Sequence, residues 1–117
     1  MYRRHKIPGE SMIDQTTIAR AARALNRAAP KGSKVILFGS YARGDATANS
    51  DLDFLVVEPK VIARIQEAAR LDAALRNIRV PMDVVVISQE TFDYWKETPN
   101  TLPYQAAREG RVLHAGT

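Results

Sequence analysis

Residues 38–58 read FGSYARGDATANSDLDFLVVE, and this stretch decides the fold. A short apolar run is followed by a turn of small residues, a polar loop, and two aspartates, Asp51 and Asp53, that lead into a second apolar run. Both runs contain β-branched or aromatic residues and are bounded by turn-forming residues, which favours strands over helices. We therefore predict two buried strands, over residues 35–38 and 53–57, with the polar loop between them.

The segments on either side extend this pattern. Residues 82–88 form a third strand-like run, and apolar residues at helical spacing predict helices over residues 11–29 and 61–79. Closer to the C-terminus we expect, in order, a short helical turn, a short helix and a strand-like run, at residues 91–96, 104–109 and 111–114. Strands interleaved with helices predict an α+β (α/β) fold, in which helices pack on one face of a small mixed β-sheet.

The composition is that of a small soluble domain. The chain has 117 residues, so we predict one domain over residues 1–117, with a flexible arm over residues 1–10. It has no cysteine, which excludes disulfides and thiolate metal sites, and no apolar run reaches the roughly 18 residues that a membrane span needs. We expect a cytoplasmic protein. The net charge of +4 suits an anionic ligand and equally an ordinary solvated surface.

The glycines of the loop first suggest a P-loop. Gly39 and Gly44 have the spacing of the two P-loop glycines. A P-loop continues with a lysine for the terminal phosphates and a Ser or Thr for magnesium, whereas this chain continues with Asp45 and Ala46. The P-loop reading therefore fails, and the glycines alone would be compatible with an ordinary turn.

The two aspartates carry a more specific signal. Side chains alternate along a strand, so Asp51 and Asp53 are expected on one face, with Cα atoms about 6.6 Å apart. Two carboxylates beside apolar surface repel one another and lose hydration unless a cation neutralises them. Magnesium is the ion that suits such ligands, because it is a hard cation that binds carboxylates, water and phosphates.

A third acid follows on another strand. Asp83 lies at the start of the run over residues 82–88, and if the second and third strands are neighbours it can come level with Asp53. A single aspartate at a strand end is usually a turn residue, but three acids at such ends are harder to explain in that way. Three carboxylates could hold two magnesium ions about 3.5–4 Å apart, which is the arrangement that serves in-line phosphoryl displacement.

These residues resemble a known family. Gly39-Ser40, a gap of ten residues and Asp51-Leu52-Asp53 resemble the signature of the nucleotidyltransferase superfamily related to DNA polymerase beta. The longer string GSYARGDATANSDLD, residues 39–53, is similar to the minimal (MNT-type) members. The resemblance extends over residues 35–88 and implies a palm-like nucleotidyltransferase fold.

The resemblance also implies a role for each matching residue. In the family the glycine and serine hold the triphosphate, the paired acids bind magnesium, and a third acid completes the site as ligand and candidate general base. The wider motif adds an arginine and a serine that are expected to hold phosphates and brace the loop. The implied nucleotide-binding residues are Gly39, Ser40, Arg43 and Ser50, and the implied catalytic residues and metal ligands are Asp51, Asp53 and Asp83.

The activity that the resemblance implies is transfer of AMP from ATP, with magnesium, onto a hydroxyl group. Few residues follow the third strand, so we expect another protein or a second copy of the chain to hold the acceptor. Minimal family members pair with a small helical HEPN-type protein as antitoxin and toxin, in which a toxin tyrosine is modified. The resemblance therefore implies an antitoxin that neutralises a HEPN-type toxin by protein adenylylation.

Two other functions compete with this one. The same fold could act as a binding module that holds its partner stoichiometrically, although three intact acids argue against a degenerate site. A nucleic-acid modifying enzyme would use the positive charge and the arginine stripe of the first helix, Arg20, Arg23 and Arg27, but no aromatic residues interleave with that stripe to stack bases. The aromatic residues Phe92, Tyr94 and Trp95 are instead expected to cover the sheet, with a partner interface as the alternative. The acceptor, the nucleotide preference and the oligomeric state stay open.

Overall fold

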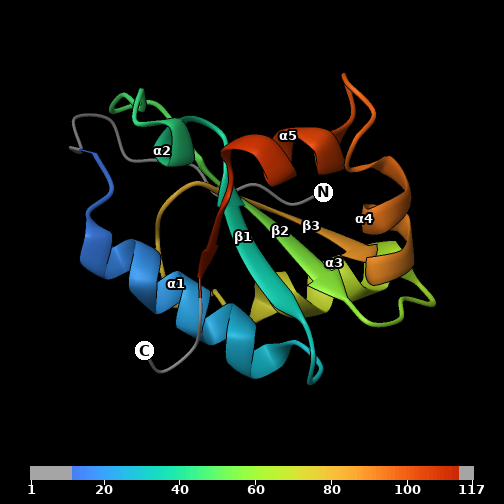
Figure 1. The fold of residues 1–117 in the computed structure, drawn as a ribbon. Helices are drawn as coiled ribbons and strands as arrows, with labels where there is room; N and C mark the ends of the chain where they lie inside the picture. The colour runs from blue at the N-terminus through green and yellow to red at the C-terminus, as the bar shows by residue number, and fades with distance from the viewer. Residues whose placement is uncertain (1–11, 114–117) are drawn as a thin grey trace.

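The computed structural model describes residues 12–113, and the predicted arm over residues 1–10 lies outside that range. No helix within the described part of the chain has both the length and the apolar character needed to cross a bilayer. In chain order the elements are α1 (Gln15–Ala28), β1 (Lys34–Phe38), α2 (Ser40–Arg43), β2 (Leu52–Glu58), α3 (Arg64–Ala73), β3 (Met82–Ser88), α4 (Gln89–Trp95), α5 (Leu102–Glu109) and β4 (Arg111–Leu113) (Figure 1).

The strands form one mixed sheet in the order β3-β2-β1-β4. β1 pairs antiparallel with β2 and with β4, whereas β2 pairs parallel with β3. The parallel pair needs a crossover connection, which α3 and its flanking loops supply. The predicted α+β class and the predicted strands are therefore confirmed, including the adjacency of the second and third strands.

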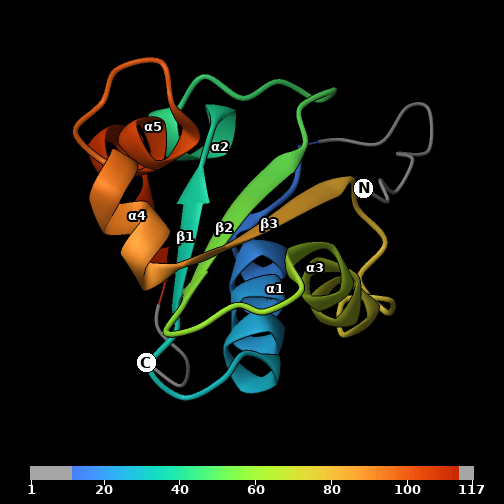
Figure 2. The same cartoon turned by 90° about the vertical axis from the view of Figure 1, so that its right-hand side faces the viewer.

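Helices cover both faces of the sheet (Figure 2). On one face, inward residues of the strands such as Leu37, Phe54 and Val84 pack in a single buried cluster with α1 and α3. On the other face, a smaller cluster includes Phe92 of α4 and Ala106 of α5. The expectation of helices on one face holds for the long helices only. The central strands are apolar on both faces, so the second face also requires cover.

The helix predicted over residues 61–79 is shorter than expected. α3 spans Arg64–Ala73, and turns continue the chain to residue 77. Leu71, Leu75 and Ile78 are buried in the larger core, whereas Ile62 and Ile65 are exposed. The sequence pattern counted Ile62, Ile65, Ala69, Leu75 and Ile78 as one stripe; of these only Leu75 and Ile78 are buried, and the buried Leu71 lies outside that stripe. Burial selects only those that face the sheet, and the turns after α3 keep Leu75 and Ile78 directed inward.

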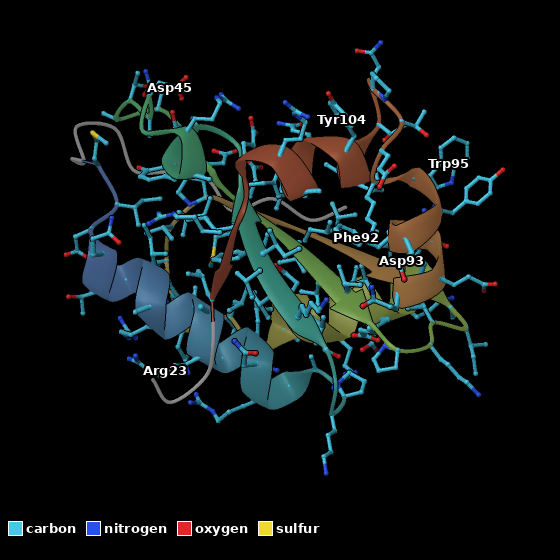
Figure 3. All side chains as sticks on the ribbon, viewed as in Figure 1. Arg23, Asp45, Phe92, Asp93, Trp95 and Tyr104 are labelled. Carbon is cyan, nitrogen blue, oxygen red and sulfur yellow. The ribbon has the colours of Figure 1, made fainter. Side chains whose placement is uncertain are left out.

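The aromatic residues of α4 divide between core and surface. Phe92 is buried in the smaller cluster, as predicted. Tyr94 and Trp95 are 74% and 41% exposed and contact one another edge to face, with ring centroids 4.9 Å apart. Figure 3 shows Trp95 at the surface beside α4. Their predicted role as sheet cover is therefore wrong, because α4 is a short helix that turns only the face of Phe92 toward the strands.

A buried carboxyl group lies at the end of β2. Glu58 is only 2% exposed, and its Oε2 atom has no hydrogen-bond partner among residues 12–113. Burial, followed by a hydrogen bond shared with Glu67, raises the pKa of Glu58 to about 7. Arg70 donates two hydrogen bonds to Glu67 at 2.7 and 2.9 Å and holds the pKa of that carboxyl low, at about 2. The pair thus keeps one proton, on Glu58, near neutral pH.

This proton makes stability depend on pH. Between pH 4.5, the ordinary value of the carboxyl, and about 7, Glu58 keeps a proton that the unfolded chain releases, so the free energy of unfolding falls as the pH rises. We expect Glu58→Gln to remove this slope and to be more stable than wild type at pH 8 by about 2–3 kcal/mol. Urea unfolding from pH 5 to 8 measures the effect, with the exposed Glu97→Gln as control. Equal slopes in Glu58→Gln and wild type would contradict the assignment.

Candidate active site

The turn after β1 brings the backbone of Gly39 close to the carboxylate of Asp53. Gly39 has φ 77° and ψ −158°, a conformation that residues with a side chain rarely adopt. A Cβ atom built on Gly39 would lie 2.4 Å from Oδ2 of Asp53. Gly44, which ends α2 in the left-handed conformation with φ 88°, has nothing within 4 Å of its Cβ position. Gly39 therefore serves both the turn and the close approach of the backbone to Asp53, whereas Gly44 serves the turn alone.

The sheet register brings two of the predicted acids together. Asp53 and Asp83 are partners in the parallel pairing of β2 with β3, so they lie on neighbouring strands about 4.8 Å apart. Asp53 lies two residues before Leu55, and Asp83 lies two residues before Val85; both apolar residues belong to the smaller core cluster. Side chains two residues apart in a strand share a face, so both acids belong to the face that α4 and α5 cover. Phe38, the residue before Gly39, is the partner of Asp53 on β1. The two carboxylates and the Gly39 turn thus meet at one end of that face.

Asp51 lies just outside the strand. β2 begins at Leu52, whose N–H donates to the carbonyl of Pro81 at 3.0 Å, and Asp51 is the preceding residue. Asp51, Asp53 and Asp83 are all half-buried. The structure therefore places the three predicted acids at neighbouring ends of β2 and β3, as the sequence predicted.

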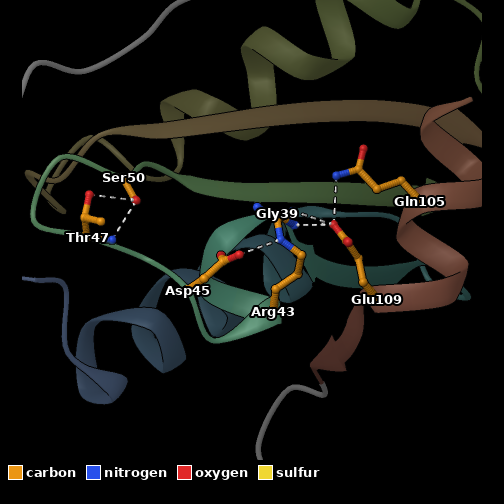
Figure 4. Close-up of polar contacts among 7 residues, drawn as sticks. All are labelled: Gly39, Arg43, Asp45, Thr47, Ser50, Gln105 and Glu109. Atoms are coloured by element: carbon orange, nitrogen blue, oxygen red, sulfur yellow. Dashed lines mark hydrogen bonds and ion pairs between the residues drawn. The ribbon is translucent and has the colours of Figure 1, made fainter. Parts of the chain in front are cut away.

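The loop that leads to the acids is braced by its own side chains. The Oγ atom of Ser50 accepts a hydrogen bond from the Thr47 N–H at 2.9 Å (Figure 4). The Ser50 amide in turn donates to the Thr47 carbonyl at 3.0 Å. These contacts are those expected of a residue that braces the loop, and contact of Ser50 with phosphate stays a prediction.

The predicted phosphate ligand Arg43 binds acidic side chains. Its Nε atom donates to Asp45 at 3.2 Å, and its Nη1 atom donates to Oε1 of Glu109 at 3.0 Å (Figure 4). The same Glu109 oxygen accepts from the Gly39 N–H at 3.2 Å and from Nε2 of Gln105 at 2.8 Å. The hydrogen bond to Asp45 raises the pKa of Arg43, so the guanidinium stays cationic at any working pH.

Sequence analysis missed Glu109 and Gln105. Both lie on α5, and Glu109 is 70 residues from Gly39 in the chain, so no local spacing rule connects them. The sequence signal that exists is the separation of four residues between Gln105 and Glu109, which places them on one side of a helix. Only the packing of α5 against β1 brings that side to the Gly39 turn.

The donor set at this end of the sheet suits a hard divalent cation. The cross-strand carboxylates of Asp53 and Asp83, with Asp51 two residues before Asp53, offer oxygen ligands of the kind magnesium prefers. Within residues 12–113 no three acidic or histidine side chains are arranged as a ready metal site. Like charges repel, so carboxylates of this kind converge fully only around a cation. The residue types fit magnesium, and binding would draw the acids together.

Comparison with known proteins agrees with this geometry. The family model described as the Nucleotidyltransferase domain matches residues 18–112. A relative in Methanocaldococcus jannaschii, MJ0604, which is named as a candidate protein adenylyltransferase, is 37% identical over 84 residues that cover 69% of this chain and 77% of the relative.

Solved structures share the fold at low sequence identity. A chain from a toxin–antitoxin complex with AMP-PNP has a TM-score of 0.52 and 24% identity, over 88% of this chain and 74% of that chain. A chain from the complex of a tri-AMPylated Shewanella oneidensis HEPN toxin with an MNT antitoxin has a TM-score of 0.50 and 20% identity, over 88% and 73% respectively.

The family match and the site geometry concern the same part of the molecule. Residues 18–112 include the Gly39 turn, the braced loop and all three acids. The archaeal relative, at 37% identity over 69% of this chain, supports the same assignment. This chain belongs to the nucleotidyltransferase domain family.

Proposed function

We propose that this protein is a magnesium-dependent protein adenylyltransferase, which moves AMP from ATP onto a hydroxyl group of a small helical HEPN-type partner and so neutralises it as an antitoxin. The observation that carries this proposal is the register of β2 and β3, which sets Asp53 beside Asp83 next to the Gly39 turn. Carboxylates that can hold magnesium, beside a backbone turn that a phosphate can approach closely, are groups that phosphoryl transfer from a polyphosphate uses.

The Gly39 turn is suited to phosphate. Gly39 has no side chain, so a phosphate oxygen can come close to the backbone there, and Ser40 offers both a hydroxyl and an amide. Arg43 adds a guanidinium that can bind phosphate oxygens. These groups would hold the β- and γ-phosphates of ATP while the α-phosphate faces the acids.

The reaction is an in-line displacement at the α-phosphorus. The acceptor hydroxyl oxygen forms a bond to the α-phosphorus, the bond from that phosphorus to the bridging oxygen of the β-phosphate breaks, and pyrophosphate leaves with the electron pair. Asp83 is the candidate base that takes the hydroxyl proton. Magnesium, when bound by Asp51, Asp53 and Asp83, would supply positive charge that offsets the charge of the phosphates. The contribution of the chain itself is to position and orient the reactants.

The choice of a protein acceptor rests on the relatives. The archaeal relative is named as a candidate protein adenylyltransferase, and one structural neighbour is a complex that contains an AMPylated HEPN toxin and an MNT antitoxin. The described part of this chain adds only short helices and a three-residue strand, β4, after β3. A partner that brings its own hydroxyl to the site is therefore the acceptor that suits this chain.

Transfer of label from ATP tests the proposal. ATP labelled at the α-phosphate is incubated with magnesium, the protein, and either a HEPN-type partner from the same genome or total RNA. We expect label on the partner protein, located by mass spectrometry, and none with the Asp51→Asn, Asp53→Asn double variant. Label on RNA would replace the protein acceptor with a nucleic acid. No label on either acceptor, with the partner bound equally by both proteins, would identify a non-catalytic binding module.

A further inference from the structure

We propose that Glu109 competes with nucleotide phosphate for the Gly39 turn, so that it sets the affinity of the protein for ATP. A single oxygen of Glu109, Oε1, accepts hydrogen bonds from the Gly39 N–H at 3.2 Å and from Arg43 Nη1 at 3.0 Å. These are two of the donors that the proposed function assigns to phosphate, and the inference rests on that function. Glu109 lies outside the Gly39–Asp53 motif.

A carboxylate and a phosphate make equivalent demands on these donors. Both are anionic oxygen groups that bind backbone N–H and guanidinium groups, and both form charge-assisted hydrogen bonds with them. Two anions cannot share the Gly39 N–H and the Arg43 Nη1 without strong repulsion at contact distance. A triphosphate that binds there must therefore move the Glu109 carboxylate away.

The contact is well suited to displacement. The Glu109 side chain is 23% exposed and that of Arg43 is 41% exposed, and ion pairs of this exposure contribute little net stability. Glu109 also lines a groove of about 550 Å³ formed by α5 and the residues just before it, which gives its side chain room to turn. Arg108 lines the same groove and lies 5.3 Å from the ring centre of Tyr104, so a cation is available there for the displaced carboxylate.

Gln105 holds the carboxylate in its competing position. Its Nε2 atom donates to Oε1 of Glu109 at 2.8 Å, the shortest of the three hydrogen bonds to that oxygen. The hydrogen bond of Gln105 goes to Glu109 and not to Gly39 or Arg43, so Gln105 acts on the phosphate site through Glu109. This arrangement supplies a second variant that weakens the competitor without changing the charge of the site.

Calorimetric titration of ATP with magnesium, and of inorganic tripolyphosphate without it, tests the inference at low ionic strength. Glu109→Gln keeps an acceptor oxygen for Gly39 but removes the charge, and we expect it to bind both ligands about tenfold more tightly than wild type. Gln105→Ala should give a smaller gain. The control is Glu90→Gln, an exposed carboxylate that follows the end of β3 farthest from Asp83, and its affinities should equal those of wild type. Circular dichroism checks the fold of each variant.

The outcomes separate this inference from the proposed function. If wild type binds ATP, Arg43→Ala weakens that binding, and folded Glu109→Gln binds no more tightly than wild type, Glu109 supports the turn and the inference is wrong while the function stands. A lower KM for ATP in Glu109→Gln supports the inference, since loss of a purely supporting contact would raise KM. If neither wild type nor any variant binds ATP, both the inference and the proposed function fall.

Discussion

Asp53→Asn is expected to lower AMP transfer by about a thousandfold or more, because the carboxylate charge at this position contributes several kcal/mol to stabilisation of a phosphoryl transition state. The amide has nearly the same shape as the carboxylate, so the packing against Gly39 stays possible. The amide also removes the like charge beside Asp83 on the neighbouring strand. The variant should therefore fold while it loses activity.

The measurement is initial rate of label transfer to the partner protein, together with urea unfolding of the same preparations. Asp93→Asn is the matched control, since Asp93 is an exposed aspartate of α4 that pairs with Lys96 at 3.4 Å. We expect Asp93→Asn to transfer at the wild-type rate. A folded Asp53→Asn protein with activity within tenfold of wild type would exclude Asp53 as a catalytic residue.

The second large effect is expected on stability. Gly39→Ala should lower the free energy of unfolding by about 2–4 kcal/mol. The alanine must adopt a backbone conformation that costs about 1–3 kcal/mol, and its new Cβ must also displace the Asp53 carboxylate. The Cβ position lies 2.4 Å from Asp53 Oδ2 and 3.2 Å from its Cγ. Displacement of that carboxylate should remove transfer activity even at temperatures where the variant is folded.

Gly44→Ala gives the cost of an ordinary left-handed position without a nearby contact. Gly44 also has a positive φ, 88°, but nothing lies within 4 Å of its Cβ position. Its substitution should therefore cost only the backbone term, about 1 kcal/mol. Equal losses in Gly39→Ala and Gly44→Ala would show that contact with Asp53 is not energetically important.

A double-mutant cycle identifies the contact directly. Asp53→Ala removes the carboxylate that the new Cβ would meet, so Gly39→Ala should destabilise the Asp53→Ala background less than it destabilises wild type. Urea denaturation of the four proteins gives the coupling free energy. Strict additivity would assign the whole effect of Gly39→Ala to backbone strain.

Much of the fold could be read from local patterns. Short β-branched runs bounded by turn residues identified β1, β2 and β3, since strand preference and alternation act over a few residues. The boundaries were less accurate for α3, because Ile62 and Ile65 continue the apolar spacing of that helix although they are exposed. Periodicity reports which residues could face a core, and only packing decides which of them do.

The candidate site divides in the same way. The Gly39-Ser40 turn, the paired acids and the third acid could be recognised from residue type and short spacing alone. That Asp83 lies level with Asp53, through the parallel register, and that Glu109 of α5 reaches the Gly39 amide and Arg43 follow only from the folded arrangement. The physical reason is that register and helix packing are set by burial of apolar side chains summed over the whole sheet, and such a sum is not contained in any local stretch of sequence.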